Sequence, residues 1–279
     1  MNPLSHAVDP GQRFTETVEA YQRYRPDYPS GLVEWILDQA QLQSGDVIMD
    51  IGCGTGITSR LFARRWLRVI GVDSNAAMLT AARIANGTIR YVQAAVENLP
   101  LSDAIAKAAI AGQAFHWFDL DRALAELARV LMPRAPCFAF WNIREDSSQF
   151  LRDYDQLLKE WCPGYPVASA DETVAQIRAH PAVSEPRENA FVQQQRFDRN
   201  GLIGGAWSSS YVVHGVVDAA GFDAALGRLF DARNENGAIE FRYRTVALAF
   251  VPRRDIGARR RRIPAGADAQ EVRVPVGGR

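Results

Sequence analysis

Residues 47–56 read Val47-Ile48-Met49-Asp50-Ile51-Gly52-Cys53-Gly54-Thr55-Gly56, and this stretch decides the fold. A short apolar run contains an acid near its end, and three glycines follow at alternate positions. Glycine lets the chain turn sharply and lets a ligand approach the backbone without a side-chain clash. A helical pattern then covers residues 58–65, and the first turn of such a helix offers unpaired N–H groups. The order of strand, glycines and helix predicts a ligand cradle at the end of a buried strand.

Outward from this loop, short apolar runs alternate with amphipathic helical patterns. This rhythm predicts a parallel sheet with helices on both of its faces, which is an α/β fold. The predicted strands are 47–51, 68–72, 89–94, 105–111 and 137–143, and the predicted helices between them are 58–65, 75–85 and 121–132.

The rhythm changes after Arg144. Helical patterns at 148–161 and 171–179 flank a loop rich in proline and glycine, and they predict a helical insertion or lid over about 144–190. Later elements are predicted as a strand at 191–197, a helix at 219–234 and a strand at 238–251. Residues 254–279 combine Arg, Gly, Ala and Pro without periodicity, so a disordered basic tail is predicted there.

The composition indicates a folded intracellular protein. Hydrophobic residues make up 47% of the 279, and the formal net charge is zero, which gives no electrostatic argument for a nucleic-acid or membrane partner. Cys53, Cys137 and Cys162 have no metal-ligand spacing, so we expect reduced thiols and no metal site. The first thirty residues lack a charged-then-apolar leader, and no apolar stretch approaches the ~20 residues of a membrane span. A cytoplasmic location is therefore expected.

The glycine spacing discriminates between two classes of cofactor. The dinucleotide fingerprint is Gly-x-Gly-x-x-Gly, with a pyrophosphate at the helix start. Here the third glycine, Gly56, comes one residue early. Asp50 also precedes the first glycine by two residues, and a carboxylate there suits an ammonium group better than a phosphate, which it would repel. The spacing therefore disfavours a nicotinamide-dependent oxidoreductase.

Residues 47–56, together with Val72-Asp73 at the next strand end, resemble the cofactor signature of class I S-adenosylmethionine-dependent methyltransferases. Further segments resemble the methyltransferase type 11 subgroup that is related to trans-aconitate methyltransferases. These segments are Tyr24-Arg25-Pro26-Asp27-Tyr28-Pro29, Gln113-Ala114-Phe115-His116-Trp117-Phe118, Trp207-Ser208-Ser209-Ser210-Tyr211 and Tyr243-Arg244-Thr245-Val246. The resemblance covers about 14–253. It implies one domain over 1–253 with a Rossmann-like seven-stranded sheet, mostly parallel with the last strand antiparallel.

The resemblance also implies S-adenosylmethionine as the cofactor and a role for each matched residue. Asp50 would support the amino group, and the backbone of the glycine loop would hold the methionine end. Asp73 would accept hydrogen bonds from both ribose hydroxyls, for which a carboxylate has the bidentate geometry. Gln113 would lie near the sulfonium. The expected cofactor residues are Asp50, Gly52, Cys53, Gly54, Gly56, Asp73, Ser74, Met78, Val96, Glu97, Gln113 and Arg25.

Two residues depart from the family pattern. Ala95 stands where many relatives carry Asp or Thr to meet the adenine amino group, so Glu97 takes over that contact or the contact is absent. Lys107 stands where relatives usually have Asp at the start of the fourth strand. Ser74 and Met78 would border the adenosine, and the Val96 amide would read a ring nitrogen of the adenine.

The acceptor side of the site is open to several interpretations. Methyl transfer from a sulfonium depends mainly on alignment, which is worth ~7–11 kcal/mol by proximity arguments. His116 is the candidate general base, and the alternative is that it packs with Trp117 as lining. Arg25 either pairs with the cofactor carboxylate or belongs to an N-terminal helix that packs on the sheet. Aromatic residues that either line an acceptor pocket or pack in the core are Trp141, Trp161, Trp207 and Tyr211.

The sequence therefore predicts a small-molecule O- or N-methyltransferase, acting as a monomer or homodimer. One alternative is a protein of the same fold that binds S-adenosylmethionine without transferring the methyl group. A nucleic-acid methyltransferase is disfavoured by the neutral charge and by the residues Gln113-Ala114-Phe115-His116, which differ from the Asn/Asp-Pro-Pro-Tyr type of motif. The identity of the acceptor is not encoded in any motif of the chain.

Overall fold

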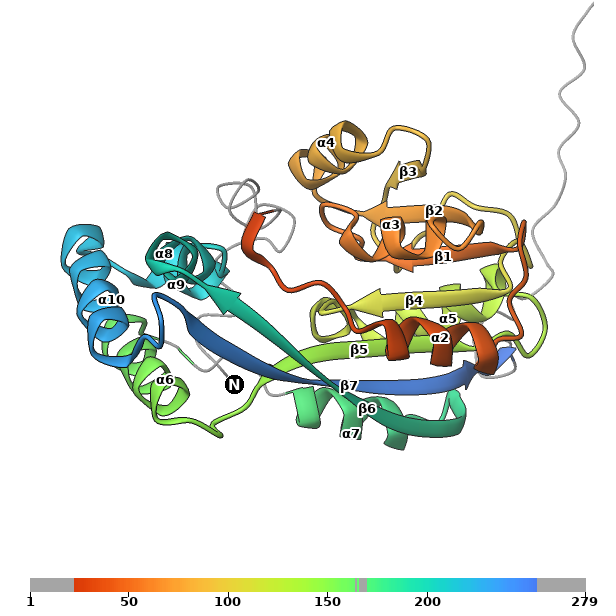
Figure 1. Ribbon diagram of the computed structural model, residues 1–279. Coiled ribbons are helices and arrows are strands. Elements are labelled where there is room, and N and C mark those ends of the chain that lie inside the picture. The colour runs from red at the N-terminus through yellow and green to blue at the C-terminus, as the bar shows by residue number, and fades with distance from the viewer. Residues whose placement is uncertain (1–22, 164, 166–169, 255–279) are drawn as a thin grey trace, which may run out of the picture.

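The computed structural model describes residues 23–163, 165 and 170–254, and its core is one seven-stranded sheet (Figure 1). The strand order is β3-β2-β1-β4-β5-β7-β6. The strands are β1 Val47–Ile51, β2 Arg68–Asp73, β3 Arg90–Gln93, β4 Ala108–Gly112, β5 Cys137–Arg144, β6 Val183–Phe197 and β7 Ile239–Pro252. The helices are α2 Ser30–Gln39, α3 Ile57–Ala63, α4 Ala76–Ala85, η2 Phe115–Trp117, α5 Leu120–Val130, α6 Gln149–Trp161, α7 Ala170–Ala179, α8 Arg199–Trp207, α9 Ser210–Gly215 and α10 Ala219–Arg233.

Strands β1 to β5 are parallel to one another, and β7 is antiparallel to both of its neighbours. This confirms the predicted Rossmann-like, mostly parallel sheet with an antiparallel last strand. The strand order reverses direction at β1, which has β2 on one side and β4 on the other. Ligands of open α/β sheets bind at such a reversal, beyond the carboxyl ends of the strands. The fold therefore directs attention to the ends of β1, β2 and β4.

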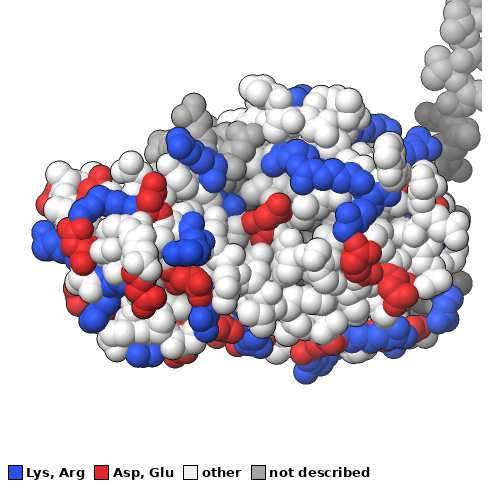
Figure 2. Space-filling model, viewed as in Figure 1, with Lys and Arg blue, Asp and Glu red and all other residues white. Residues whose placement is uncertain are grey.

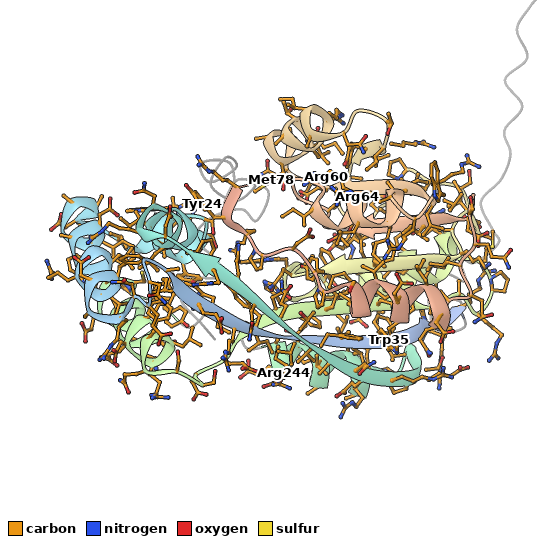
Figure 3. The ribbon with its side chains drawn as sticks, viewed as in Figure 1. Tyr24, Trp35, Arg60, Arg64, Met78 and Arg244 are labelled. Atoms are coloured by element: carbon orange, nitrogen blue, oxygen red, sulfur yellow. The ribbon has the colours of Figure 1, made fainter. Side chains whose placement is uncertain are left out.

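Strand β1 is apolar because the sheet is covered on both faces. Ile48 belongs to the core cluster that contains α2 and Phe62 of α3, whereas Met49 and Ile51 belong to the cluster that contains α5. Trp35 of α2 packs on the sheet through Phe138 and Phe191, with ring centroids 5.5 and 6.0 Å away (Figure 3). A strand buried on both faces shows a continuous apolar run rather than an alternating one, and this run fixes where the glycine loop begins.

A second unit, which we call the cap, lies at one end of the sheet. It consists of α6, α8, α9 and α10, which gather around the ends of β6 and β7 (Figure 1). Phe150, Phe222 and Phe241 are buried in its core. Tyr24, on the N-terminal segment, packs against Phe197 at the end of β6 with ring centroids 6.5 Å apart (Figure 3). The N-terminal segment therefore connects the cap to the sheet.

The predicted lid over 144–190 is wrong in its boundary. Residues 183–190 begin β6, and α7 contacts β6 and η2 rather than the cap. The reason is that β6 is an edge strand, paired only with β7, so most of its first half is exposed and polar. Pro186 also lies in a register shift between Ser184 and Arg187, and proline is tolerated in such edge bulges. The usual alternation of a strand is therefore missing from this part of the sequence.

Few of the described residues test the prediction of a disordered tail. Arg254 donates hydrogen bonds to the carbonyls of Ala128 and Leu131, at 3.0 and 2.7 Å, so it closes the end of α5 and is not part of a tail. Residues 255–279 lie outside the described residues. Within the part of the chain that the structure describes, the helices are too short or too polar to span a membrane.

Candidate active site

The glycine loop, residues 52–56, leads from β1 into α3. Gly52, Gly54 and Gly56 all have positive φ, at 66°, 54° and 75°. A Cβ on Gly52 would lie 2.5 Å from the Cβ of Ala114, and one on Gly56 would overlap the hydroxyl of Tyr91. A Cβ on Gly54 would meet nothing within 4 Å. Packing therefore accounts for the outer two glycines, whereas the open side of Gly54 leaves room for a ligand to approach the backbone.

We expect alanine at these two glycines to have different effects. Gly56→Ala combines left-handed strain of ~1–2 kcal/mol with a clash against a rigid ring, so the free energy of unfolding should fall by more than about 2 kcal/mol. Gly54→Ala carries the strain alone. Thermal denaturation of both variants checks this, and adding Tyr91→Phe to Gly56→Ala should recover part of the loss. Equal destabilisation by the two substitutions would contradict this assignment.

Asp73, at the end of β2, is tied to the glycine loop. Its Oδ2 accepts a hydrogen bond from the Gly54 amide and its Oδ1 from the Asn75 amide, both at 2.8 Å. Burial raises the pKa of this carboxyl, and the backbone hydrogen bonds partly oppose that shift. Each carboxylate oxygen has a second lone pair, so the group can still accept from two ligand hydroxyls. The structure thus brings together Asp73 and the glycine loop, as the sequence predicts.

Asp50 is buried beneath the loop, with 1% of its surface exposed. Its Oδ2 accepts from the Ser59 hydroxyl at 2.6 Å, whereas Oδ1 has no hydrogen-bond partner among the described residues. Burial raises the pKa of Asp50 to about 7, and the charge of Asp73 adds to this rise. A buried carboxylate oxygen without a partner is costly unless a cation or donor satisfies it. Ser59, which no sequence pattern singled out, completes this pair.

The predicted adenosine residues follow β2 and β3. Asn75 caps α4 by accepting from the Ala77 and Met78 amides at 2.9 and 3.1 Å. The Val96 side chain is buried in the core, and Glu97 accepts from the Asp119 amide at 2.9 Å. Glu97 is therefore engaged in holding the start of α5. Ser74 is exposed, and its carbonyl accepts from Gln93 at 3.3 Å.

A small cavity lies directly against the glycine loop, and we call it the loop-side cavity. Gln113, just past β4, has a φ of 57° and donates from its side chain to the Asn142 carbonyl at 3.2 Å. A Cβ on Gly112 would lie 2.5 Å from the Tyr28 hydroxyl, so glycine there lets the N-terminal segment close over the sheet. The lining residues are Arg25, Pro26, Tyr28, Gly52, Cys53, Ile57, Thr58, Gly112, Gln113 and Asn142.

Four of the predicted cofactor residues thus line one cavity, namely Arg25, Gly52, Cys53 and Gln113. The other predicted residues are not part of its wall. They lie in the loop itself, beneath it, after the ends of β2 and β3, or, for Met78, buried in α4: Asp50, Gly54, Gly56, Asp73, Ser74, Met78, Val96 and Glu97. Burial raises the pKa of the Cys53 thiol, which keeps it protonated and favours a packing role.

A much larger cavity of 910 Å³ lies between the sheet and the cap, and we call it the cap-side cavity. It shares Arg25, Pro26, Gln113 and Asn142 with the loop-side cavity, so the two adjoin. Trp141 and Tyr211 line it, as one of the two interpretations of the aromatic residues predicts.

Two other aromatic residues pack inside the cap instead. Trp161 and Trp207 both contact Phe222, with ring centroids 5.9 and 5.6 Å away. The Trp207 indole also donates to Asp223 at 2.7 Å. Neither of them is part of the wall of the cap-side cavity, so the acceptor-pocket interpretation is wrong for both.

His116 lines the cap-side cavity from η2. The Trp141 indole donates to His116 Nδ1 at 3.3 Å, and the His116 ring lies against Trp117 with centroids 4.8 Å apart. An indole nitrogen can only donate, so Nδ1 must be the acceptor. When the imidazole is neutral, its proton is therefore on Nε2.

Lys107 lies at the opposite end of the sheet from the glycine loop. Its ammonium donates to Asp46 Oδ2 at 2.7 Å and to the Gln41 carbonyl at 2.6 Å, just before β4 begins at Ala108. The hydrogen bond from Lys107 holds the pKa of Asp46 below its usual value. The fourth strand thus starts three residues later than predicted, and the departure at Lys107 supports the amino ends of β1 and β4 rather than the site.

Comparisons with known proteins agree with this geometry. Residues 49–139, which include the glycine loop and Asp73, match the methyltransferase domain family. An uncharacterized methyltransferase of Schizosaccharomyces pombe is 29% identical over 188 residues, which cover 67% of this chain and 74% of that protein. Residues 49–139 thus form a methyltransferase domain, and the fold is that of the class I S-adenosylmethionine-dependent methyltransferases. The trans-aconitate subgroup stays a prediction for this methyltransferase.

Two further comparisons bear on the methyltransferase. An uncharacterized methyltransferase of Mycobacterium tuberculosis is 33% identical over 145 residues, 52% of this chain and 58% of that protein. The chain therefore aligns with little more than half of that relative's length. A solved structure described as a type II methyltransferase of Anaeromyxobacter dehalogenans has a TM-score of 0.63 and 25% identity, and the match covers 82% of this chain and 98% of that one. The methyltransferase fold thus extends well beyond residues 49–139, into the cap.

Proposed function

We propose that the protein binds S-adenosylmethionine at the glycine loop and transfers its methyl group to a small molecule in the cap-side cavity. The observation that carries this proposal is that the two cavities adjoin and share Arg25, Pro26, Gln113 and Asn142. A cofactor on the loop side and an acceptor on the cap side would meet at these residues. Proximity of this kind is the main requirement of methyl transfer.

The residues at the loop fit the cofactor. Oδ1 of Asp50, which lies beneath the loop and has no hydrogen-bond partner among the described residues, would support its ammonium group from below. The open side of Gly54 lets the cofactor approach the backbone of the loop. Asp73 has lone pairs left for the two ribose hydroxyls. When bound, S-adenosylmethionine supplies a sulfonium methyl that an acceptor lone pair can attack while the carbon–sulfur bonding pair returns to sulfur. The chain's own residues then have to hold the acceptor in line and exclude water.

A small acceptor is favoured over a nucleic acid. Basic and acidic side chains intermingle on the face of the described residues in Figure 2, and the formal net charge of the chain is zero. Binding to a nucleic-acid backbone relies on clustered Lys and Arg. The cap-side cavity lies between the sheet and the cap and is partly open to solvent, and its 910 Å³ is within the size range of small-molecule sites.

His116 is proposed to position the acceptor as a hydrogen-bond donor, because its Nδ1 is engaged by Trp141. Glutamine places an N–H close to the position of Nε2, whereas alanine removes the donor. His116→Gln should keep at least about a third of the parent kcat/KM, and His116→Ala should lose about tenfold. A general base predicts a loss of ~10²–10⁴ for both variants, with a shifted pH profile. Steady-state kinetics of the two variants separates these roles.

The experiment that tests the function is a methyl-transfer screen with product detection by mass. Carboxylic acids, phenols and amines are incubated with the protein and S-adenosylmethionine, and a gain of one methyl group is expected for one of these classes. The variant Asp73→Ala serves as the inactive control. Binding of S-adenosylmethionine without any methylated product would favour the alternative of a binding protein that does not transfer the methyl group.

A further inference from the structure

One wall of the cap-side cavity holds a guanidinium surrounded by phenol rings. Arg144 is the last residue of β5, and it donates from Nη1 to the Tyr211 hydroxyl at 3.3 Å and from Nη2 to the Tyr165 hydroxyl at 2.9 Å. Its guanidinium carbon also lies 5.0 Å from the ring centroid of Tyr154. Tyr243 is directly opposite Arg144 in the β5–β7 register. Cation–π contact and hydrogen bonds hold the fork of donors in one orientation.

This guanidinium has no carboxylate in direct contact among the described residues. The Tyr165 hydroxyl donates to Asp155 at 2.6 Å, so Asp155 reaches Arg144 only through a phenol. Asp155 is also paired with Lys159 at 2.6 Å, which balances its charge. Three other acids line the same cavity, namely Glu145, which is half-buried, and Asp146 and Asp171, which are exposed; none of them forms an ion pair with Arg144 among the described residues. A charge removed from water is normally matched by a counter-charge, so this wall of the cavity is suited to an anion.

A second arginine strengthens the positive potential at the same place. Arg25 lines the cap-side cavity and acts on the charge of Tyr211. Burial raises the pKa of Tyr211, but the charge of Arg144, with hydrogen bonds from Ser209 and Arg144, outweighs burial and brings that pKa below its ordinary value. For Tyr243, by contrast, burial dominates and raises the pKa to about 12. Tyr211 and Tyr243 are therefore both within reach of the charges of the two arginines.

The position of Arg144 relative to the cofactor follows from the strand. Asn142, which borders both cavities, is two residues before Arg144 in β5, so the two side chains share one face of the sheet. Two residues of a strand span ~7 Å. Arg144 thus lies further along the strand than the place where the two cavities meet, at the outer end of β5.

We propose that the acceptor carries an oxyanion, a carboxylate or phosphate, that docks on Arg144 and the Tyr211 hydroxyl, and that a different group of the acceptor is methylated. This inference rests on the proposed function, and it identifies a subsite within the cap-side cavity. Only two donors of Arg144 are used by tyrosines, and a guanidinium has five. The planar fork of the remaining donors matches two oxygens of one anion.

Calorimetric titration of the full chain, saturated with S-adenosylhomocysteine, tests the subsite. The probes are the straight-chain dicarboxylates of four to eight carbons, their diamides, and inorganic phosphate. At least one dicarboxylate or phosphate should bind, and its diamide counterpart should not. Arg144→Met should weaken that binding at least tenfold and Arg144→Lys less, whereas Arg242→Met should leave it unchanged. Arg242 is the matched control, because it is exposed, pairs with Glu240 and does not line the cavity.

The outcomes of this experiment separate a failure of the oxyanion subsite from a failure of the proposed function. If Arg144→Met binds the probe as tightly as the parent, or if the diamide binds as well as the acid, the oxyanion subsite is wrong. If S-adenosylhomocysteine binds but none of the oxyanions does, the subsite is also wrong, and the proposed function survives. If S-adenosylhomocysteine itself fails to bind the parent, the proposed function is what fails. Tyr211→Phe keeps the ring and loses the hydroxyl, and it should weaken binding of the oxyanion three- to tenfold. This milder variant tests the subsite even if Arg144→Met does not fold.

Discussion

Asp73→Ala is expected to weaken the binding of S-adenosylmethionine by roughly 10²–10⁴-fold. The substitution removes the carboxylate that we propose accepts from both ribose hydroxyls, and a hydrogen bond to a charged group contributes ~1.5–3 kcal/mol. It also releases the Gly54 and Asn75 amides, which Asp73 binds at 2.8 Å, so the glycine loop loses its connection to β2. Isothermal titration calorimetry measures the change directly.

Two control variants make this first prediction specific. Asp73→Asn keeps one acceptor oxygen, so its affinity should lie between those of Asp73→Ala and the parent. Asp103→Ala removes an exposed acid that pairs with Arg129. Neither residue is near the glycine loop in the sequence, so this variant should bind S-adenosylmethionine as the parent does. Thermal melts confirm that each variant is folded before its affinity is compared. An Asp73→Ala protein that binds within threefold of the parent would refute the assignment of this carboxylate.

Asp50→Asn is expected to act in opposite directions on stability and on binding. The folded protein raises the pKa of Asp50 from 3.8 to about 7, so this group's contribution to stability is present at acid pH and is lost as pH rises through about 7. At pH 8 the parent therefore holds a buried carboxylate with one oxygen unsatisfied. The neutral amide avoids that cost, so Asp50→Asn should raise the free energy of unfolding of the ligand-free protein by ~2–4 kcal/mol at pH 8.

Affinity for S-adenosylmethionine should fall in the same variant. The amide oxygen can still accept a hydrogen bond from the cofactor's ammonium group but carries no charge, so a loss of ~10–100-fold is expected. In the parent, affinity should rise with pH between 6 and 7.5 as Asp50 ionises, and Asp50→Asn should flatten that rise. Thermal melts and titrations at pH 5.5 and 8 measure both effects. Destabilisation of the ligand-free variant at pH 8 would contradict this account of Asp50.

Other titrating groups do not obscure the effect of Asp50 between pH 5.5 and 8. Acids with a lowered pKa, such as Asp46 and Glu126, stabilise the fold above their unfolded pKa and withdraw that support only in strongly acid solution. Burial also raises the pKa of Asp73, which shifts stability in the same direction as Asp50. Because Asp73 is present in both proteins, the difference between the parent and Asp50→Asn isolates Asp50.

The parallel half of the sheet could be predicted because its strands are buried on both faces. Strands β1 and β4 are almost entirely buried, and their apolar runs are visible in the sequence. The first half of β6 could not be predicted, because an edge strand exposes polar residues such as Glu185 and Asn189. Helix α8 was also missed. It contains three glycines within nine residues, and only the structure shows that the ring of Tyr24 packs against Gly204.

The cofactor half of the site could be predicted because its residues are close in sequence. Asp50 and the glycine loop are contiguous, and Asp73 follows at the end of the next strand, where parallel strands place their ends together. The acceptor half could not be predicted in this way. Around Arg144, the tyrosines 154, 165, 211 and 243 come from four separate segments, and only tertiary packing brings them to one guanidinium. The available signal was weak: an arginine that ends the apolar run of β5, two residues after Asn142.

The central claim is that the glycine loop and Asp73 form a site for S-adenosylmethionine. Titration calorimetry of the full chain with S-adenosylmethionine and, separately, with NADH tests it most directly. The claim predicts one binding site for S-adenosylmethionine, competition by S-adenosylhomocysteine, and no binding of NADH at the same concentrations. Binding of NADH with no heat from S-adenosylmethionine would contradict it.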